Sequence, residues 1–202
     1  MRNKLKFKKL LNEYRSYKFE LEFVEDVLNE YHREFEVTYR TYCADNGIDL
    51  DKLHNDNKER VNKIFPDHDT TVVEQVTENK KKPDVIKHKS IYRELARKLH
   101  PDSLPEGDER YDEYKEAFQR ATHAHDNSAW GDLFDLVERY DVNLRNYDSI
   151  CNSLVKDIAK IKKQIEYHKK TFSWSLYECE GTKDCEERVI KNFLMHVFRY
   201  TV

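Results

Sequence analysis

The chain contains 202 residues, of which 38% are hydrophobic and 37% are charged. Only 4 glycines and 4 prolines are present, and so few turn-forming residues favour long, solvent-exposed helices over a compact sheet protein. The 36 basic and 39 acidic residues give a formal net charge of -3, which excludes a general attraction to nucleic acid or to anionic lipid. A nucleic-acid partner would need a local basic patch.

No apolar run approaches the length that spans a membrane. The basic N-terminus, MRNKLKFKKLLNEY, lacks the continuous apolar core of a signal peptide. We therefore expect a cytoplasmic protein with no membrane partner. The cysteines at positions 43, 151, 179 and 185 are scattered and predict no disulfide framework.

Residues 1–65 are expected to contain one long helix followed by a shorter one. From Lys4 to Asn46 there is no proline or glycine, and apolar residues recur three and four positions apart, as in the heptads of a coiled coil. These positions are Phe7, Leu10, Tyr14, Tyr17, Leu21, Val24, Leu28, Tyr31 and Phe35. Gly47 predicts the end of this helix, and the shorter helix is expected from Asp49 to about Phe65. Residues 66–84 are predicted to form a surface linker loop.

The stretch from Val85 to Asp102, VIKHKSIYRELARKLHPD, predicts a helix with one apolar face and one basic face. The apolar positions are Ile91, Tyr92, Leu95, Ala96 and Leu99. The basic positions are Lys89, Arg93 and Arg97, which stand four residues apart, with Lys98 at their edge. Pro101 biases His100 away from helical backbone angles, so the helix is expected to end there. His100 and Asp102 would then lie in a turn beside the basic face.

The pattern Tyr-Arg-x-Leu-Ala-x-x-x-His-Pro-Asp, from Tyr92 to Asp102, resembles the second helix and signature loop of the J-domain (DnaJ-type) co-chaperones. The resemblance implies a protein that docks on a DnaK-class heat-shock chaperone and stimulates its ATP hydrolysis. The chaperone-binding residues that it implies are His100, Pro101, Asp102, Lys89, Arg93, Arg97 and Lys98. The basic residues would steer the association, and the tripeptide would couple docking to hydrolysis. An ordinary core helix that ends at a proline is the alternative, because a bare His-Pro-Asp is a weak signal.

Residues 85–140 are predicted to form the J-domain-like head. After the loop SLPEGDER, a helix with an inward stripe stands where the family has its third helix; the stripe is Tyr111, Tyr114, Phe118, Ala121 and His125. Ser128 is expected to cap a further helix that runs to about Tyr140. The family's usual first helix is not recognisable. Either Val72 to Val76 is a degenerate version of it, or the helix that begins at Asp49 replaces it.

Residues 141–171 carry a second heptad pattern at Tyr147, Cys151, Leu154, Ile158, Ile161, Ile165 and His168. Two helices with narrow apolar stripes are expected to pair antiparallel within one chain. Residues 172–202 predict an apolar corner, formed by Phe172, Trp174 and Leu176, and a last helix from Glu186 to about Tyr200. The apolar face of this last helix is expected to be covered by the start of the first helix, around Leu5, Phe7 and Leu11.

Other chemistry finds little support in the sequence. Neither the set Cys179, Cys185 and His196 nor the pair His123 and His125 has the ligand spacing of a zinc site, so we expect no metal and no other cofactor. His100 beside Asp102 resembles an oriented general base, but a turn at a helix end supplies no nucleophile and no oxyanion donors. We therefore expect a protein that is not an enzyme.

The sequence thus predicts an all-α protein in which a J-domain-like helical head is carried on a long antiparallel coiled-coil hairpin. The expected function is that of a co-chaperone, with a client protein bound through the coiled coil or the C-terminal helix. The alternative is a structural coiled-coil adaptor with an inactive J-like head. A third hypothesis, nucleic-acid binding through Lys80 to Lys82 and the basic face, would be recognised by salt-dependent binding.

Overall fold

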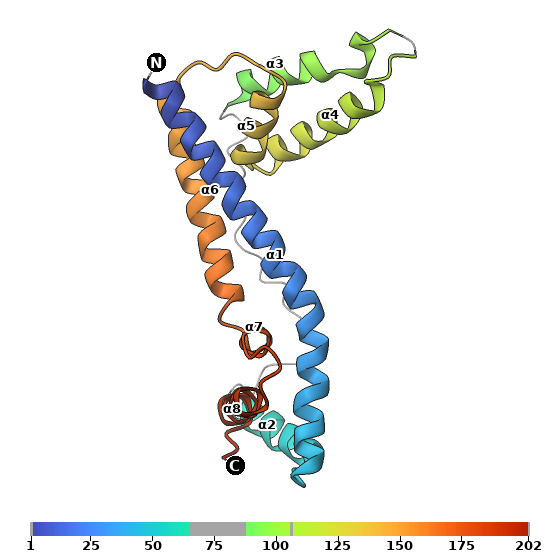
Figure 1. Cartoon of the computed structure of the whole chain (residues 1–202), viewed down its shortest axis with the longest axis vertical. Coiled ribbons are helices and arrows are strands. Elements are labelled where there is room, and N and C mark those ends of the chain that lie inside the picture. The colour runs from blue at the N-terminus through green and yellow to red at the C-terminus, as the bar shows by residue number, and fades with distance from the viewer. Residues whose placement is uncertain (1, 65–87, 106, 202) are drawn as a thin grey trace. The chain divides into compact units, whose positions relative to one another are not determined.

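The computed structural model describes residues 2–64, 88–105 and 107–201, and these residues form helices and turns with no strand among them (Figure 1). The prediction of an all-α fold is confirmed. The predicted linker, residues 66–84, lies outside the described residues, and so does the segment from Val72 to Val76. The chain divides into two compact units, Met1–Phe19 with Thr77–Lys162 and Glu20–Val76 with Lys163–Val202. The predicted segment boundaries stay a prediction.

Two long helices contribute residues to both units. Helix α1, Arg2–Asp45, is uninterrupted for 44 residues and ends just before Gly47, whose φ of 66° lies in the left-handed region that favours glycine. Helix α6, Tyr147–His168, carries the second heptad pattern, and Leu154, Ile158 and Ile165 are buried along it. The apolar spacing therefore located both helices correctly.

Within the first unit α1 and α6 run parallel, and the predicted antiparallel hairpin is wrong. The ring of Phe7 lies 5.8 Å from that of Tyr147, and further along both helices Lys162 Nζ lies 3.3 Å from a carboxylate oxygen of Glu13. Residue numbers thus rise together along the pair. A heptad pattern specifies which face of a helix is buried, and it does not specify the direction of the partner.

The first unit also contains α3 (Lys89–Leu99), a short 3₁₀ helix η1 (Pro101–Ser103), α4 (Tyr111–Asp126) and α5 (Trp130–Arg139). Helices α3 and α4 lie side by side and antiparallel (Figure 1). They are joined by Tyr92, whose ring stacks on that of His125 at 4.2 Å between centroids. Leu95, Leu99 and Phe134 are fully enclosed in the core between α3, α4 and α5. Phe7 of α1 meets Phe134 edge-on, with 6.4 Å between the ring centroids.

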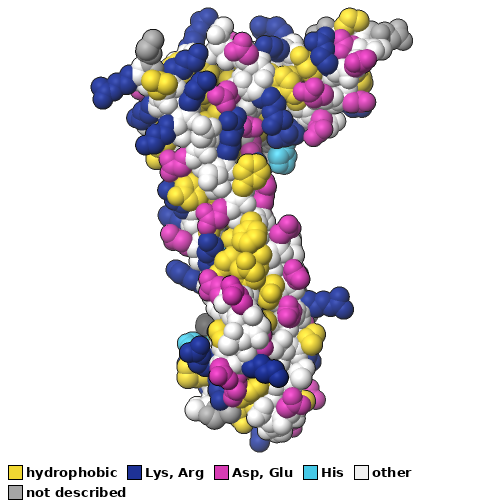
Figure 2. All heavy atoms as spheres, viewed as in Figure 1, with side chains coloured by type: hydrophobic (Ala, Val, Ile, Leu, Met, Phe, Trp, Pro, Cys, Tyr) yellow, Lys and Arg dark blue, Asp and Glu magenta, His cyan; other side chains and the backbone are white. Residues whose placement is uncertain are grey.

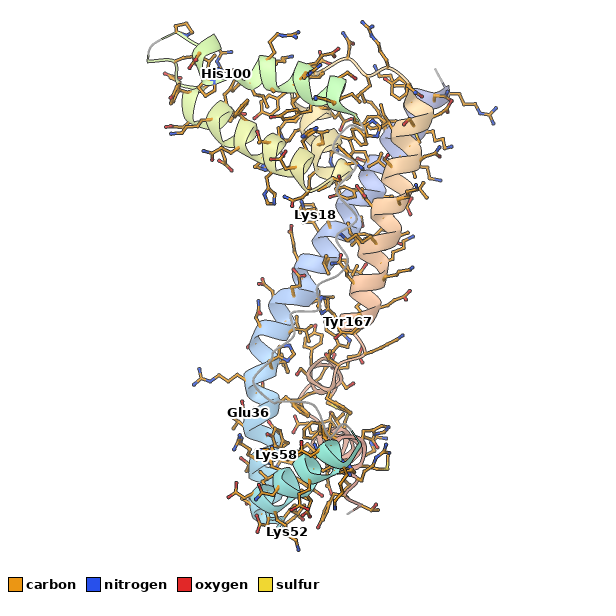
Figure 3. All side chains as sticks on the ribbon, turned by 180° about the vertical axis from the view of Figure 1, so that it is seen from behind. Lys18, Glu36, Lys52, Lys58, His100 and Tyr167 are labelled. Carbon is orange, nitrogen blue, oxygen red and sulfur yellow. A yellow bond between two sulfur atoms is a disulfide. The ribbon has the colours of Figure 1, made fainter. Side chains whose placement is uncertain are left out.

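Helix α5 packs unusually closely on α1 at Gly131. A Cβ atom at Gly131 would overlap the ring of Tyr14, so only glycine fits there without a shift. The Tyr14 hydroxyl donates a hydrogen bond to Asp132 (3.0 Å), and Lys18, labelled in Figure 3, forms an ion pair with the same carboxylate. Arg15 reaches Asp135 with its Nε at 2.6 Å. The acidic face of α5 is therefore neutralised by basic and hydroxyl groups of α1.

The N-terminus of α5 is capped from another helix, which corrects the prediction for Ser128. The Ser128 backbone has a φ of 54°, its hydroxyl is buried without a partner among the described residues, and Ala129 occupies the cap position. Instead, Asp157 of α6 accepts a hydrogen bond from the Gly131 amide at 2.8 Å. Burial raises the pKa of Asp157, whereas the amides of Gly131 and Trp130 act in the opposite direction. The Asp157 carboxylate, which the tertiary fold brings to the start of α5, therefore takes the capping role predicted for Ser128.

The second unit is built around the end of α1. Its other elements are α2 (Leu50–Ile64), α7 (Phe172–Tyr177), α8 (Lys183–Phe193) and a turn of π-helix, η2 (Leu194–Phe198). Its core consists of Phe35, Tyr39, Cys43, Ile48, Leu176, Ile190, Leu194 and Phe198. Lys169 and Glu20 form an ion pair at 2.7 Å, which joins the chain after α6 to α1.

Three expectations about the second unit are wrong. The last helix is covered by Phe35 and Tyr39 near the end of α1, because the start of α1, with Leu5, Phe7 and Leu11, belongs to the first unit. Helix α2 belongs to this unit and packs on η2, so it does not replace a first helix of the head. Cys179 and Cys185, for which the sequence predicted no disulfide framework, form a disulfide that joins the turn after α7 to α8.

None of the described helices has the length and apolar character needed to cross a membrane.

The Asp157 cap gives a first testable prediction. Asp157→Ala should lower the free energy of unfolding by about 1–2 kcal/mol, because it leaves buried amides of α5 without an acceptor. Asp157→Asn retains an acceptor oxygen and should cost less. Denaturant unfolding followed by circular dichroism measures both changes, with Lys156→Ala, an exposed neighbour on α6, as the matched control. Equal stability of the Asp157→Ala and Lys156→Ala proteins would show that the cap is unimportant.

Candidate functional site

Helix α3 separates its apolar and basic side chains as the sequence predicts. Ile91, Leu95 and Leu99 are buried. The predicted basic residues, Lys89, Arg93, Arg97 and Lys98, are exposed. Among the described residues no carboxylate lies within ion-pair distance of Arg93 or Arg97, and Lys98 donates instead to the Asp141 carbonyl oxygen at 3.3 Å. The basic face is therefore available to a negatively charged partner.

The His100–Pro101–Asp102 tripeptide lies where the chain turns from α3 towards α4 (Figure 3). His100 ends α3 with an extended backbone (φ -61°, ψ 125°), as Pro101 requires of the residue before it. Pro101 then begins the short helix η1, where its missing amide hydrogen costs nothing. The Leu104 amide closes this turn by donating to the Pro101 carbonyl oxygen at 3.0 Å. The backbone of the turn is thus specified locally.

The two polar side chains of the tripeptide differ in how firmly they are held. The His100 ring packs edge-on against Phe118 of α4, with 5.4 Å between centroids, and its side chain is 49% exposed. The Asp102 side chain is 88% exposed. The turn therefore presents Asp102 to solvent, while α4 supports one edge of the imidazole.

The contacts of His100 Nδ1 depend on the protonation state of the ring. In the neutral ring Nδ1 accepts a hydrogen bond from the Asp102 amide at 3.3 Å. The Asp102 carboxylate lies 3.5 Å from the same nitrogen, and this contact becomes favourable only when Nδ1 carries a proton. Nδ1 cannot accept from the Asp102 amide and donate to the Asp102 carboxylate at the same time, so the two contacts exclude each other.

The approach to α4 is stabilised by a pair that sequence reasoning missed. Asp108 accepts hydrogen bonds from the Arg110 amide (2.9 Å) and from the Arg110 guanidinium at 3.0 and 2.7 Å. These bonds lower the pKa of Asp108 to about 2. The signal was present in the sequence as an aspartate two residues before Arg110, the cap residue of α4, which is the spacing of an Asx turn.

The structure brings all seven predicted site residues into the segment formed by α3 and η1. It does not give the cluster His123 and His125 a shared role. His125 is buried and stacked on Tyr92, whereas His123 is exposed. A histidine that sequence reasoning did not select, His88, contacts Trp130 edge-on at 5.1 Å and lies 3.0 Å from Ser153 Oγ. His88 and His125 thus both pack edge-on against Trp130.

Metal ligation has no geometric basis in the part of the chain that the structure describes. No three His, Cys, Asp or Glu side chains gather there in a way that could hold an ion. The sulfur atoms of Cys179 and Cys185 are joined to each other, so neither can bind a metal in this state.

Comparisons of the chain with protein families, with curated proteins and with solved structures found no match.

The Asp108–Arg110 pair predicts a dependence on pH. Because the pKa of folded Asp108 is near 2, below the ordinary value of about 4, its stabilising bonds are complete above about pH 4 and are lost as the pH falls towards 2. An NMR titration of the Asp108 carboxyl carbon should therefore have its midpoint near 2. Arg110→Gln should move that midpoint upwards, whereas Lys115→Gln on the same helix should leave it in place. An unchanged midpoint in the Arg110 variant would exclude the pair as the cause.

Proposed function

We propose that the protein is a co-chaperone with a J-domain-like head, which binds a DnaK-class heat-shock chaperone and stimulates its ATP hydrolysis. One observation carries the proposal: an antiparallel helix pair, α3 and α4, presents His100, Pro101 and Asp102 at its turn, beside an exposed basic face. In this proposal α3 and α4 take the places of the family's second and third helices.

Each part of this arrangement has a physical role. The exposed guanidinium groups of Arg93 and Arg97 attract an acidic surface and orient the encounter. The tripeptide then makes the specific contact, with Asp102 fully presented and His100 braced by Phe118. The buried residues Leu95 and Leu99 hold α3 in place during this contact, so that the turn acts as a preorganised unit.

The rest of the proposal concerns what surrounds the head. The protein supplies no catalytic group or cofactor of its own, and the nucleotide chemistry belongs to the chaperone. We place it in the cytoplasm, where DnaK-class chaperones act. In that reducing compartment Cys179 and Cys185 would be thiols for much of the time and would form their bond transiently.

A second candidate function is a structural adaptor whose J-like head is inactive. One observation favours it: α1 is 44 residues long and contributes to both units, as expected of a spacer between binding surfaces. Nucleic-acid binding is a weaker candidate, because Lys80 to Lys82 lie outside the described residues and α4 of the head carries four acidic residues against two basic ones.

Steady-state ATP turnover by a DnaK-class chaperone, measured with and without this protein, tests the proposal. The wild type should accelerate turnover and His100→Gln should abolish the effect, while changing the free energy of unfolding by no more than about 1 kcal/mol, as at other exposed sites. His123→Gln, at an exposed histidine of α4, is the matched control and should retain full stimulation. Failure of the wild type to stimulate would favour the adaptor, and unfolding of the His100 variant would give the turn an architectural role.

Charge reversal on α3 should act on the encounter. Arg93→Glu with Arg97→Glu should slow association with the chaperone by about tenfold at low salt, with a smaller effect at high salt and little change in dissociation. Stopped-flow or surface-binding kinetics measure the two rates. Lys115→Glu with Arg120→Glu makes the same change in net charge on exposed positions of α4. If both double variants slowed association equally, net charge and not the basic face of α3 would be responsible.

A further inference from the structure

A group of three aromatic rings in mutual contact lies on the second unit, one of them exposed and two of them half-buried. Phe23 of α1 is 52% exposed, and its ring meets that of Tyr177 of α7 edge-on at 6.4 Å. Tyr177 in turn meets Tyr31 of α1 at 5.3 Å. We call these three residues the aromatic patch. In Figure 2 hydrophobic side chains gather over the middle of α1, with acidic side chains beside them.

The patch is flanked by carboxylates. Glu30 and Glu34 are exposed on α1 next to Tyr31, and Glu186 of α8 lies close enough to act on the same phenol. Partial burial raises the pKa of Tyr31, and the negative charges of these three glutamates raise it further. Glu34 stands three positions after Tyr31 on α1, which places the two residues on the same side of the helix.

Aromatic rings that touch one another and stay exposed or half-exposed leave apolar area in water, and contiguous apolar patches often mark interaction surfaces. The electron-rich faces of tyrosine and phenylalanine rings attract ammonium and guanidinium groups, and neighbouring carboxylates strengthen that attraction. A carboxylate partner would be repelled by the same rim. The chemistry of this surface therefore selects for positive charge combined with apolar bulk.

We propose that the aromatic patch, with its rim of Glu30, Glu34 and Glu186, docks a segment of another protein that carries lysine or arginine between apolar side chains. The apolar side chains pack on Phe23 and Tyr177, and a cation lies against Tyr31 within reach of the glutamates. The patch shares no residue with the proposed chaperone-binding set, so this inference stands apart from the co-chaperone function and is measured without a chaperone.

The test uses the full chain and a fluorescein-labelled synthetic peptide of about 15 residues that alternates lysine and leucine in an amphipathic pattern. Fluorescence anisotropy should detect binding that weakens with added salt. A second peptide, with glutamate in place of every lysine, should bind at least about tenfold more weakly. Equal binding of both peptides would overturn the proposal, because it would show general hydrophobic adhesion.

Variants of the protein assign the binding to the patch. Phe23→Ser, and separately Glu30→Gln with Glu34→Gln, should each weaken binding of the lysine peptide by about fivefold or more. The matched controls are Val37→Ser, at a position that is 59% exposed on the same helix, and Asp56→Asn with Glu59→Gln on α2. Both controls should bind as the wild type does. Circular dichroism confirms that each variant is folded.

Two results would refute the proposal. If the patch variants and the control variants lost peptide binding equally, the binding would depend on general hydrophobic or acidic character and not on the aromatic patch. Self-association of the peptide-free protein that Phe23→Ser removes, detected by sedimentation at several concentrations, would make a second copy of this chain the occupant of the patch.

Discussion

The contact between α5 and α1 at Gly131 is the constraint on which the first unit depends. The ring of Tyr14 occupies the space where a residue other than glycine at position 131 would place its Cβ atom. The carboxylate of Asp157, on α6, accepts a hydrogen bond from the Gly131 amide. Three helices therefore meet at one residue. Helix α5 supports α4, and α4 supports the imidazole of His100 through Phe118. The backbone of the turn is specified locally, but the support of the His100 ring depends on an internal contact made by residues far from it in the sequence.

Most helices could be located from the sequence because apolar spacing reports burial directly. Leu95, Leu99 and Ile91 were predicted to face inward and are buried, and the stops at Pro101 and Gly47 act through backbone angles that only the local residues decide. The local geometry of the candidate site was predictable for the same reason. A turn closed by a proline, beside a helix with charges four residues apart, needs no tertiary information.

The missed features all require knowledge of which segments meet. Heptad spacing is the same for a parallel and an antiparallel partner, so the direction of α6 relative to α1 was not encoded in it. Ser128 stands where local rules place a cap residue, but the acceptor at the start of α5 is Asp157, which lies on α6. The bond between Cys179 and Cys185 likewise depends on how the chain turns between α7 and α8. The sequence separation of six residues does not predict that turn.

The order in which the chain leaves the ribosome adds a consequence to the position of α1. Tyr14 and Asp132 are separated by 118 residues, and Glu13 and Lys162 by 149, so these contacts of the first unit join segments that are far apart in the sequence. At about 5–20 residues per second, α1 waits on the order of ten seconds in a growing chain before α5 and α6 exist to cover it. Its apolar stripe is uncovered throughout that interval. A protein that we propose to recruit a chaperone thus has, during its own synthesis, the kind of exposed hydrophobic segment that chaperones bind.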